Sequence, residues 1–286
     1  MGTTDDITYT DWIGRTQTLT DRVTAVPVKA LQATLNDAAV TPADGDPLPP
    51  LWHWLFFLPD APQSQVGPDG HPKRGGFLPP VALERRMWAG GRLRFVGAAP
   101  RVGEVITRTT EIRDVQKKDG KAGSMVFVTL RHEIATPHGL AVEEEQDIVY
   151  IAMPERFVPP PPQAAPEDPV WSESLDVDPV LLFRYSALTF NGHRIHYDRP
   201  YAMEVEKYPG LVVHGPLQAM ALMEFARRNC PSGQVSGYSF RGVRPLFDFD
   251  TVSMQGFARA DGGHDLATVN GEGHVCMKAT VHWAST

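Results

Sequence analysis

A run of eight residues concentrates the side chains best suited to proton transfer. Asn191-Gly-His-Arg-Ile-His-Tyr-Asp198 contains two imidazoles, a carboxamide and a carboxylate. Histidine exchanges protons most easily near neutral pH, so His193 and His196 are candidates for acid–base catalysis. The His-x-x-His spacing also occurs in metal sites, but no third ligand lies nearby in the sequence. We therefore expect neither a metal nor any other cofactor.

A second chemical signal lies downstream, in Leu211-Val-Val-His-Gly-Pro216. Gly215 stands immediately before Pro216, and proline is a typical first residue of a helix. The N–H groups of a first helical turn have no partner inside the helix, and the helix dipole makes that end positive. The Gly215 N–H is therefore a candidate donor to an oxyanion. A plain helix-entry glycine is the alternative.

Together the two segments resemble the MaoC-like hot-dog hydratases and dehydratases. Thr189-Phe-Asn-Gly-His-Arg-Ile-His-Tyr-Asp198 is most similar to a subgroup that contains type-2 hydroxyacyl-thioester dehydratases and mesaconyl-C4-CoA hydratase-like proteins. The resemblance covers nearly the whole chain and is most specific in residues 183–216. It implies a CoA or acyl-carrier thioester substrate.

The resemblance also implies the reaction, which is reversible addition of water across the α,β double bond of an enoyl thioester. His196 takes a proton from water, and Asn191 holds that water through its side-chain carbonyl. The Gly215 N–H stabilises the negative charge that spreads onto the thioester oxygen. In the general family the position of Asn191 is acidic. An asparagine can hold the water but cannot accept its proton.

The remaining polar residues of these segments are assigned to substrate binding: His193, Arg194, Tyr197 and His214. For His193 a supporting role is an equal alternative. The resemblance points to a short, branched, carboxylated acyl group of the mesaconyl- or itaconyl-CoA kind. A buried arginine would discriminate for such a carboxylate, because an uncharged chain would leave it unpaired. The candidates are Arg194, Arg85 and Arg86.

Three other functions stay open. A 3-hydroxyacyl-ACP or -CoA dehydratase of fatty-acid metabolism would have a plain apolar acyl tunnel. A non-catalytic acyl-CoA-binding hot-dog protein would follow if Asn191 marks an inactive site. A thioesterase would need a base directed at the thioester carbonyl, and the motif offers none.

The elements that must position these residues form two similar halves. Residues 158–169 include four consecutive prolines, which favour an extended spacer. We predict a degenerate N-terminal unit over 1–157, a linker over 158–169 and a catalytic unit over 170–286. The predicted fold is α+β, a double hot-dog in which each unit wraps an antiparallel sheet around a long helix.

Local patterns predict the individual elements. In the first half we expect a helix at Pro80–Ala89 that ends at Gly90-Gly91. Strands are expected at Arg92–Val96, Glu104–Val115, Ser124–Ile134 and Val142–Ile151. In the second half we expect helices at Val180–Phe190 and Pro216–Arg228, and strands at Val235–Arg241, Thr251–Arg259, Leu266–Asn270 and His274–Trp283.

The first unit is expected to be catalytically silent. If Pro80 corresponds to Pro216, then Pro79 stands in the place of Gly215. Proline has no backbone N–H and cannot stabilise an oxyanion. We therefore expect one active site per chain, with the first unit lending a wall to the acyl pocket.

Composition excludes several classes of protein. The net charge of −7 argues against a nucleic-acid partner. The longest apolar stretch, Leu51–Leu58, is far too short to span a membrane. Met1–Asp6 is acidic and polar, unlike a signal peptide. We expect a cytoplasmic homodimer with Cys230 and Cys276 reduced.

Overall fold

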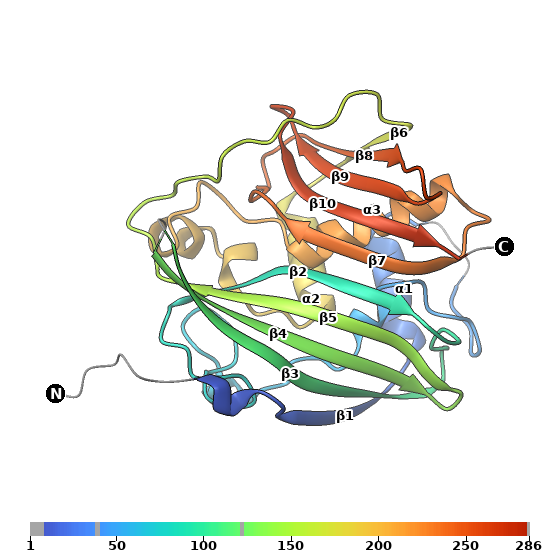
Figure 1. Ribbon diagram of the computed structural model, residues 1–286, viewed down its shortest axis with the longest axis horizontal. Helices are drawn as coiled ribbons and strands as arrows, with labels where there is room; N and C mark the ends of the chain where they lie inside the picture. Colours follow the sequence, from blue (N-terminus) through green and yellow to red (C-terminus); the bar gives the residue numbers. More distant parts are fainter. Residues whose placement is uncertain (1–8, 38–40, 121–122, 285–286) are drawn as a thin grey trace.

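The computed structural model describes residues 9–37, 41–120 and 123–284, and one continuous antiparallel sheet dominates it (Figure 1). The first half supplies β1 Thr16–Arg22, β2 Arg85–Phe95, β3 Val105–Gly120, β4 Gly123–Thr136 and β5 Gly139–Ile151. The second half supplies β6 Trp171–Leu175, β7 Val235–Gly242, β8 Val252–Ala258, β9 His264–Asn270 and β10 Val275–Trp283. The N-terminal stretch Met1–Asp6, which we compared with a signal peptide, lies outside the described residues.

The order of the strands reveals an internal repeat. It runs β1-β3-β4-β5-β2-β7-β10-β9-β8-β6. Counted inward from the two edges, the strands of the two halves correspond one to one. Strands β1, β3, β4, β5 and β2 of the first half match β6, β8, β9, β10 and β7 of the second. The two halves join where β2 pairs with β7. Gly91 lies opposite Phe240 at this junction. The predicted double hot-dog, with two fused units, is confirmed, but among the described residues the long central helix is found in the second half alone.

Three helices pack on one face of the sheet: α1 Ala25–Thr34, α2 Pro179–Leu188 and α3 Gly215–Asn229 (Figure 1). Every residue of α3 from Leu217 to Ala226 is buried, as expected for an apolar helix enclosed by a sheet. The α2 helix begins where the sequence predicted, because the Asp178 carboxylate accepts the Leu181 N–H at 2.7 Å. Both helices predicted in the second half are thus confirmed.

The helix predicted at Pro80–Ala89 is wrong. These residues lead into β2, which pairs with β5 on one edge and β7 on the other. Pairing on both edges outweighs the local helical pattern. Gly90 and Gly91 do not stop a helix but permit close strand packing. A Cβ on Gly90 would lie 2.5 Å from the Phe240 oxygen, and one on Gly91 2.9 Å from the Glu145 oxygen.

The comparison of Pro79 with Gly215 fails for the same reason, because Pro79 does not stand at the start of a helix. The first half differs from the second at another place. Between α1 and β2, its described residues form only short 3₁₀ turns, at Trp52–Leu55 and Gln63–Gln65. The second half has α3 between α2 and β7. The described part of the first half therefore offers no long helix whose N-terminus could face a substrate.

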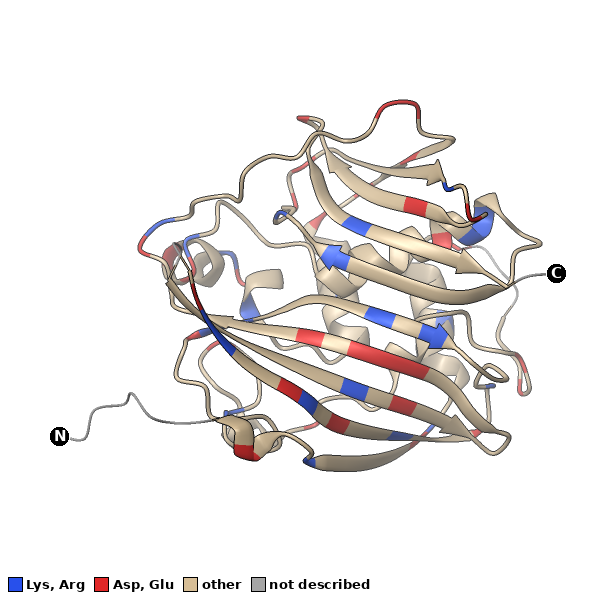
Figure 2. Cartoon of the chain, viewed as in Figure 1, with Lys and Arg blue, Asp and Glu red and all other residues tan. Residues whose placement is uncertain are grey.

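The two faces of the first-half sheet differ in polarity. Figure 2 shows acidic and basic residues side by side along β2, β4 and β5. Arg92 pairs with Glu145 and Asp147, and Arg94 pairs with Glu143. Because side chains alternate along a strand, the residues between them point to the other face, toward the helices. The active-site cavity lies on that inner face.

The proline-rich segment connects the end of β5 to the start of β6. Its Pro160 oxygen accepts a hydrogen bond from Arg244 of the second half at 2.7 Å. Domain boundaries at 158–169 remain a prediction, because one sheet runs through both halves. Among the described residues, no helix is both long and apolar enough to cross a membrane.

Candidate active site

The segment with the candidate catalytic residues leaves α2 through a sharp turn. Phe190 adopts a left-handed conformation (φ 49°) directly after the helix. The Asn191 side-chain oxygen then accepts the His193 N–H at 3.0 Å, which closes a tight turn. One turn of 3₁₀ helix follows at Arg194–His196. The turn directs the segment across the cavity wall.

His196 is fixed as a neutral proton acceptor. Its Nδ1 lies 2.7 Å from the Val212 oxygen and must donate to it, which leaves the lone pair on Nε2. Burial lowers the pKa of His196 well below 6.5, and the neighbouring histidines lower it further. His196 also lines the cavity. Its unprotonated Nε2 can therefore act as a base near neutral pH.

His214 lies directly behind His196. The two rings stack with centroids 3.7 Å apart, and His214 Nε2 lies 2.8 Å from the Ser186 hydroxyl. His214 is completely buried and is absent from the described cavity lining. Its position supports the His196 ring from behind, whereas we had predicted a contact with substrate.

Gly215 is the first residue of α3 and lines the cavity. Its N–H belongs to the first helical turn, which has no intrahelical acceptor and carries the positive end of the dipole. A Cβ at this position would lie 3.7 Å from the Trp88 oxygen, an ordinary contact. Packing therefore does not require glycine at position 215. The candidate role of its N–H remains a prediction.

Two predicted substrate-binding residues have local partners. The Arg194 guanidinium donates to Asp198 at 2.7 and 2.9 Å and to the Pro68 oxygen at 3.0 Å. The Tyr197 hydroxyl donates to the Gly192 oxygen at 2.9 Å. Both residues line the cavity, but these bonds engage the groups that would recognise a polar ligand.

A buried ion-pair network that we did not predict supports His193. The Glu206 carboxylate lies 3.1 Å from His193 Nε2 and 3.0 Å from Arg85 Nε. All three side chains are buried. Arg85 comes from the first half, so both halves build the site. Only the tertiary fold reveals this network, because no local spacing links the three residues.

A loop of the first half also lies at the site, although nothing in its sequence predicts this position. Asp69-Gly-His71 reads as an ordinary polar turn. In the structure, the His71 ring lies 4.2 Å from the His193 ring, and the Asp69 backbone oxygen accepts the Arg194 backbone N–H at 2.9 Å. Across the described ranges, no three His, Cys, Asp or Glu side chains are arranged to hold a metal ion.

One cavity of about 1850 Å³ connects the catalytic segment with the inner face of the first-half sheet. Polar side chains line its far part: Arg108, Thr110, His132, Glu144 and Gln146. Glu144 bonds to His53 at 2.8 Å, and burial lowers the pKa of Arg108. An apolar chain filling this part of the cavity would keep water from these polar groups, at a cost in free energy.

The buried histidines predict a pH-dependent stability. Burial lowers the pKa of His214 to about 3 and that of His196 well below 6.5. Unfolded histidine takes up a proton near pH 6.5, so below this pH the unfolded chain binds more protons than the folded one. Below about pH 6.5, we expect the free energy of unfolding to decrease as the pH is lowered. The expected slope is about 1.4 kcal/mol per pH unit for each of these histidines.

Urea unfolding between about pH 8 and about pH 5 measures this slope. Equal stability at both ends of the range would contradict neutral, buried His196 and His214.

Comparison with known proteins identifies the family of the chain. The hydroxyacyl-thioester dehydratase type 2 family matches residues 51–248. The chain is 47% identical over 273 residues to the mesaconyl-C(4)-CoA hydratase of Chloroflexus aurantiacus, covering 94% of this chain and 96% of that protein. The fold is similar to that of a MaoC-like dehydratase from Phytophthora capsici, with a TM-score of 0.73, 15% identity and 98% of each chain covered.

A double hot-dog protein from Mycobacterium tuberculosis is also similar in fold, with a TM-score of 0.59 and 15% identity. The alignment covers 96% of this chain and 98% of that one. At such low identity these two structures establish the fold alone, whereas the sequence matches extend over most of the chain. The protein described here belongs to the hydroxyacyl-thioester dehydratase type 2 family.

Proposed function

We propose that the protein is a hydro-lyase that adds water to the α,β double bond of an enoyl-CoA thioester. The observation that carries this proposal is the fixed tautomer of His196, whose Nε2 lone pair stands in a cavity beside the N-terminus of α3. The relative with 47% identity is named a mesaconyl-C(4)-CoA hydratase, which supports the same reaction.

The geometry supports the following sequence of steps. His196 Nε2 takes a proton from water while the water oxygen bonds to Cβ. The π electrons move toward the thioester, and the Gly215 N–H stabilises the resulting enolate oxygen. The enolate electron pair then takes the proton back from His196 to form the Cα–H bond. No proton is gained or lost overall, and the reverse order gives dehydration.

For Asn191 we propose a different role from the one expected from the sequence. Its side-chain oxygen already accepts the His193 N–H, and the amide NH₂ offers two N–H groups that can bind water. That group can donate to the oxygen of the attacking water and hold it in place. We propose this positioning role in place of the predicted contact through the carbonyl.

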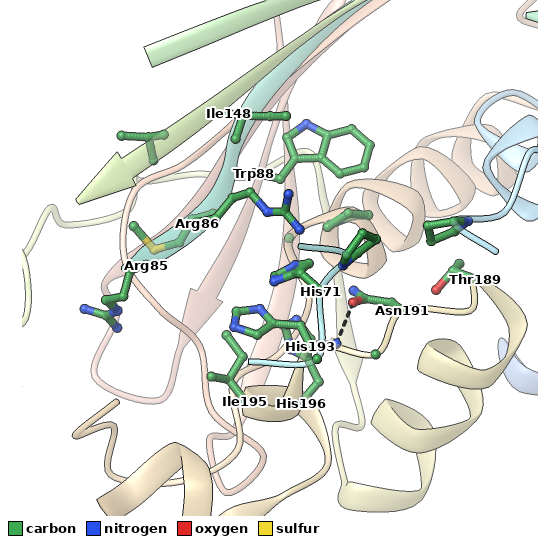
Figure 3. A pocket seen from close by; sticks show the side chains of 18 of the residues that line it. His71, Arg85, Arg86, Trp88, Ile148, Thr189, Asn191, His193, Ile195 and His196 are labelled. Carbon is green, nitrogen blue, oxygen red and sulfur yellow. Dashed lines mark hydrogen bonds between the residues drawn. The ribbon is translucent and has the colours of Figure 1, made fainter. Parts of the chain in front are cut away.

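For the substrate we propose a short acyl chain with a free carboxylate. Of the three predicted arginines, Arg194 is paired with Asp198 and Arg85 with Glu206. Arg86 lies near His71 in the cavity, and no carboxylate among the described residues forms an ion pair with it. Figure 3 shows Arg86 reaching toward His71, whereas Arg85 points away. We therefore propose that Arg86, which also interacts with Tyr150, receives the substrate carboxylate.

One group in the far part of the cavity argues against the fatty-acyl alternative. Buried Arg108 Nε has no hydrogen-bond partner among the described residues, and a long apolar chain beside it would leave it unpaired. A dehydratase acting on a short 3-hydroxyacyl thioester remains the second candidate. The family name favours it, and it is the same reaction run in reverse.

The Arg86 assignment predicts a change in selectivity. Arg86→Gln should lower kcat/KM for mesaconyl-C4-CoA by about 100-fold and change that for crotonyl-CoA little, because only the first substrate has a carboxylate to pair. Arg244→Gln is the control, since Arg244 also lines the cavity but bonds to a backbone oxygen. An equal loss for both substrates, or wild-type preference for an eight-carbon enoyl-CoA, would contradict the assignment.

We further propose that the protein is a cytoplasmic homodimer and that it accepts CoA or acyl-carrier thioesters. The strong similarity to a CoA-thioester hydratase favours CoA. Light scattering of the purified protein measures its oligomeric state, and kinetics with matched CoA and acyl-carrier substrates identify the carrier.

A further inference from the structure

We propose that His71, oriented by Asp69, is a second catalytic residue, which accepts a hydrogen bond from the attacking water. This inference rests on the proposed hydratase function. A water molecule has two O–H groups, and His196 can accept only one of them. In the proposed mechanism the Asn191 side chain has other partners, because its oxygen accepts the His193 N–H and its NH₂ donates to the water.

The loop that carries His71 is built to lie against the catalytic segment. Gly70 has φ 90°, and a Cβ on it would lie 1.7 Å from the Gly192 oxygen. A Cβ on Gly192 would in turn lie 2.6 Å from the Gly70 oxygen. Only glycine at both positions lets the backbones approach so closely. The Asp69 backbone oxygen accepts the Arg194 backbone N–H, and the Pro68 backbone oxygen accepts a hydrogen bond from the Arg194 guanidinium.

Asp69 fixes the tautomer of His71. One carboxylate oxygen accepts the His71 backbone N–H at 3.1 Å, and the other lies 3.0 Å from His71 Nδ1. Burial would raise the pKa of Asp69, but these bonds outweigh it and hold the pKa well below its usual range. An ionised carboxylate only accepts, so Nδ1 carries the hydrogen and Nε2 carries the lone pair.

His71 lies against the catalytic segment on the cavity wall. Its ring lies 4.2 Å from that of His193, which lies 5.4 Å from that of His196. Figure 3 shows His71 between Arg86 and the catalytic segment, across from Asn191. The side chain is 22% exposed and lines the cavity, so a molecule there can reach it. Burial lowers the pKa of His71 to about 3, which keeps the ring neutral near pH 7.

In the proposed step, one O–H of the water donates to His196 Nε2 and the other to His71 Nε2. The oxygen lone pair then faces Cβ. As the O–Cβ bond forms, the first O–H bond breaks and its proton moves to His196, which later delivers it to Cα. The second hydrogen stays on oxygen and becomes the product hydroxyl, so His71 neither gains nor loses a proton.

Asp69→Asn tests this role with little change in shape. Asparagine can still accept the His71 backbone N–H, but its NH₂ would donate to Nδ1 and force the ring hydrogen onto Nε2. We expect kcat for enoyl-CoA hydration to fall by about 100-fold, with KM changed by less than about threefold. His71→Ala should show a similar loss that added imidazole partly restores.

The matched control is Glu272→Gln. Glu272 bonds to His274 Nδ1 at 3.0 Å with the same two-residue spacing, and neither residue lines the catalytic cavity. This variant should keep wild-type kcat. A wild-type kcat in Asp69→Asn, or a loss in His71→Ala that accompanies a lower Tm and resists imidazole, would overturn the role of His71. If the wild type hydrates no enoyl thioester, the proposed function itself fails.

Discussion

Replacing His196 with alanine should lower kcat/KM for enoyl-CoA hydration by at least about 100-fold, the usual scale for loss of a general base. The Val212 oxygen fixes the His196 tautomer, and burial keeps the ring unprotonated. His214 is also buried at the start of α3, but it is absent from the described cavity lining. Steady-state kinetics with a saturating enoyl-CoA separate the expected loss in kcat from any change in KM.

His138→Ala is the control for this experiment, because His138 is exposed on the turn between β4 and β5. It should keep wild-type kinetics. Circular dichroism of the His196 variant establishes whether the chain is folded. Near-native turnover in a folded His196→Ala protein would show that another group is the base.

Gly70→Ala should disrupt the active site, although Gly70 has no side chain that could take part in catalysis. The added Cβ would lie 1.7 Å from the Gly192 oxygen, and φ 90° is strained for any residue with a side chain. The loop must move, which displaces the Asp69–His71 pair and removes two hydrogen bonds to Arg194. We expect stability to fall by about 2–3 kcal/mol and kcat/KM by about 100-fold.

Gly76→Ala on the same connection is the matched control. A Cβ on Gly76 would meet nothing within 4 Å, so this variant should keep wild-type stability and activity. Urea unfolding and steady-state kinetics measure both effects. If the two variants had the same stability and the same activity, the close approach of the loop to the catalytic segment would contribute to neither property.

Much of the second half could be predicted from local sequence. The capping residue Asp178 and the proline after it mark the start of α2, and the apolar residues of α3 predict a buried helix. The position of His196 on the cavity wall also depends on local structure, because a tight turn and a short helix determine the course of the backbone from Asn191 to Asp198. These features depend on neighbours a few residues apart.

The errors arise where distant residues decide the structure. Pro80–Ala89 resembles a helix locally, but β2 pairs with a strand on each edge, one of them from the second half. Glu206 and Arg85 meet across more than a hundred residues. His71 comes from a loop whose sequence signals only a turn. Spacing along the chain cannot predict such encounters.

The repeat itself was predicted correctly for a partly wrong reason. We matched the halves through two proline-started helices, whereas the structure matches them through the mirrored strand order around β2 and β7. The first half was expected to supply a wall of the acyl pocket and, in Arg85 or Arg86, a candidate for binding a carboxylate. In the structure it brings Asp69, His71 and Arg85 to the site.

The most direct test of the central claim mixes the purified protein with mesaconyl-C4-CoA in water enriched in oxygen-18. The absorbance of the enoyl thioester and the amount of free CoA are followed together. We predict that the absorbance falls without release of CoA, and that mass spectrometry finds one labelled oxygen in the hydroxyl at Cβ. Release of free CoA would indicate a thioesterase, and unchanged substrate at high protein concentration would indicate a binding protein. Either result would contradict the assignment of this site as a thioester hydratase.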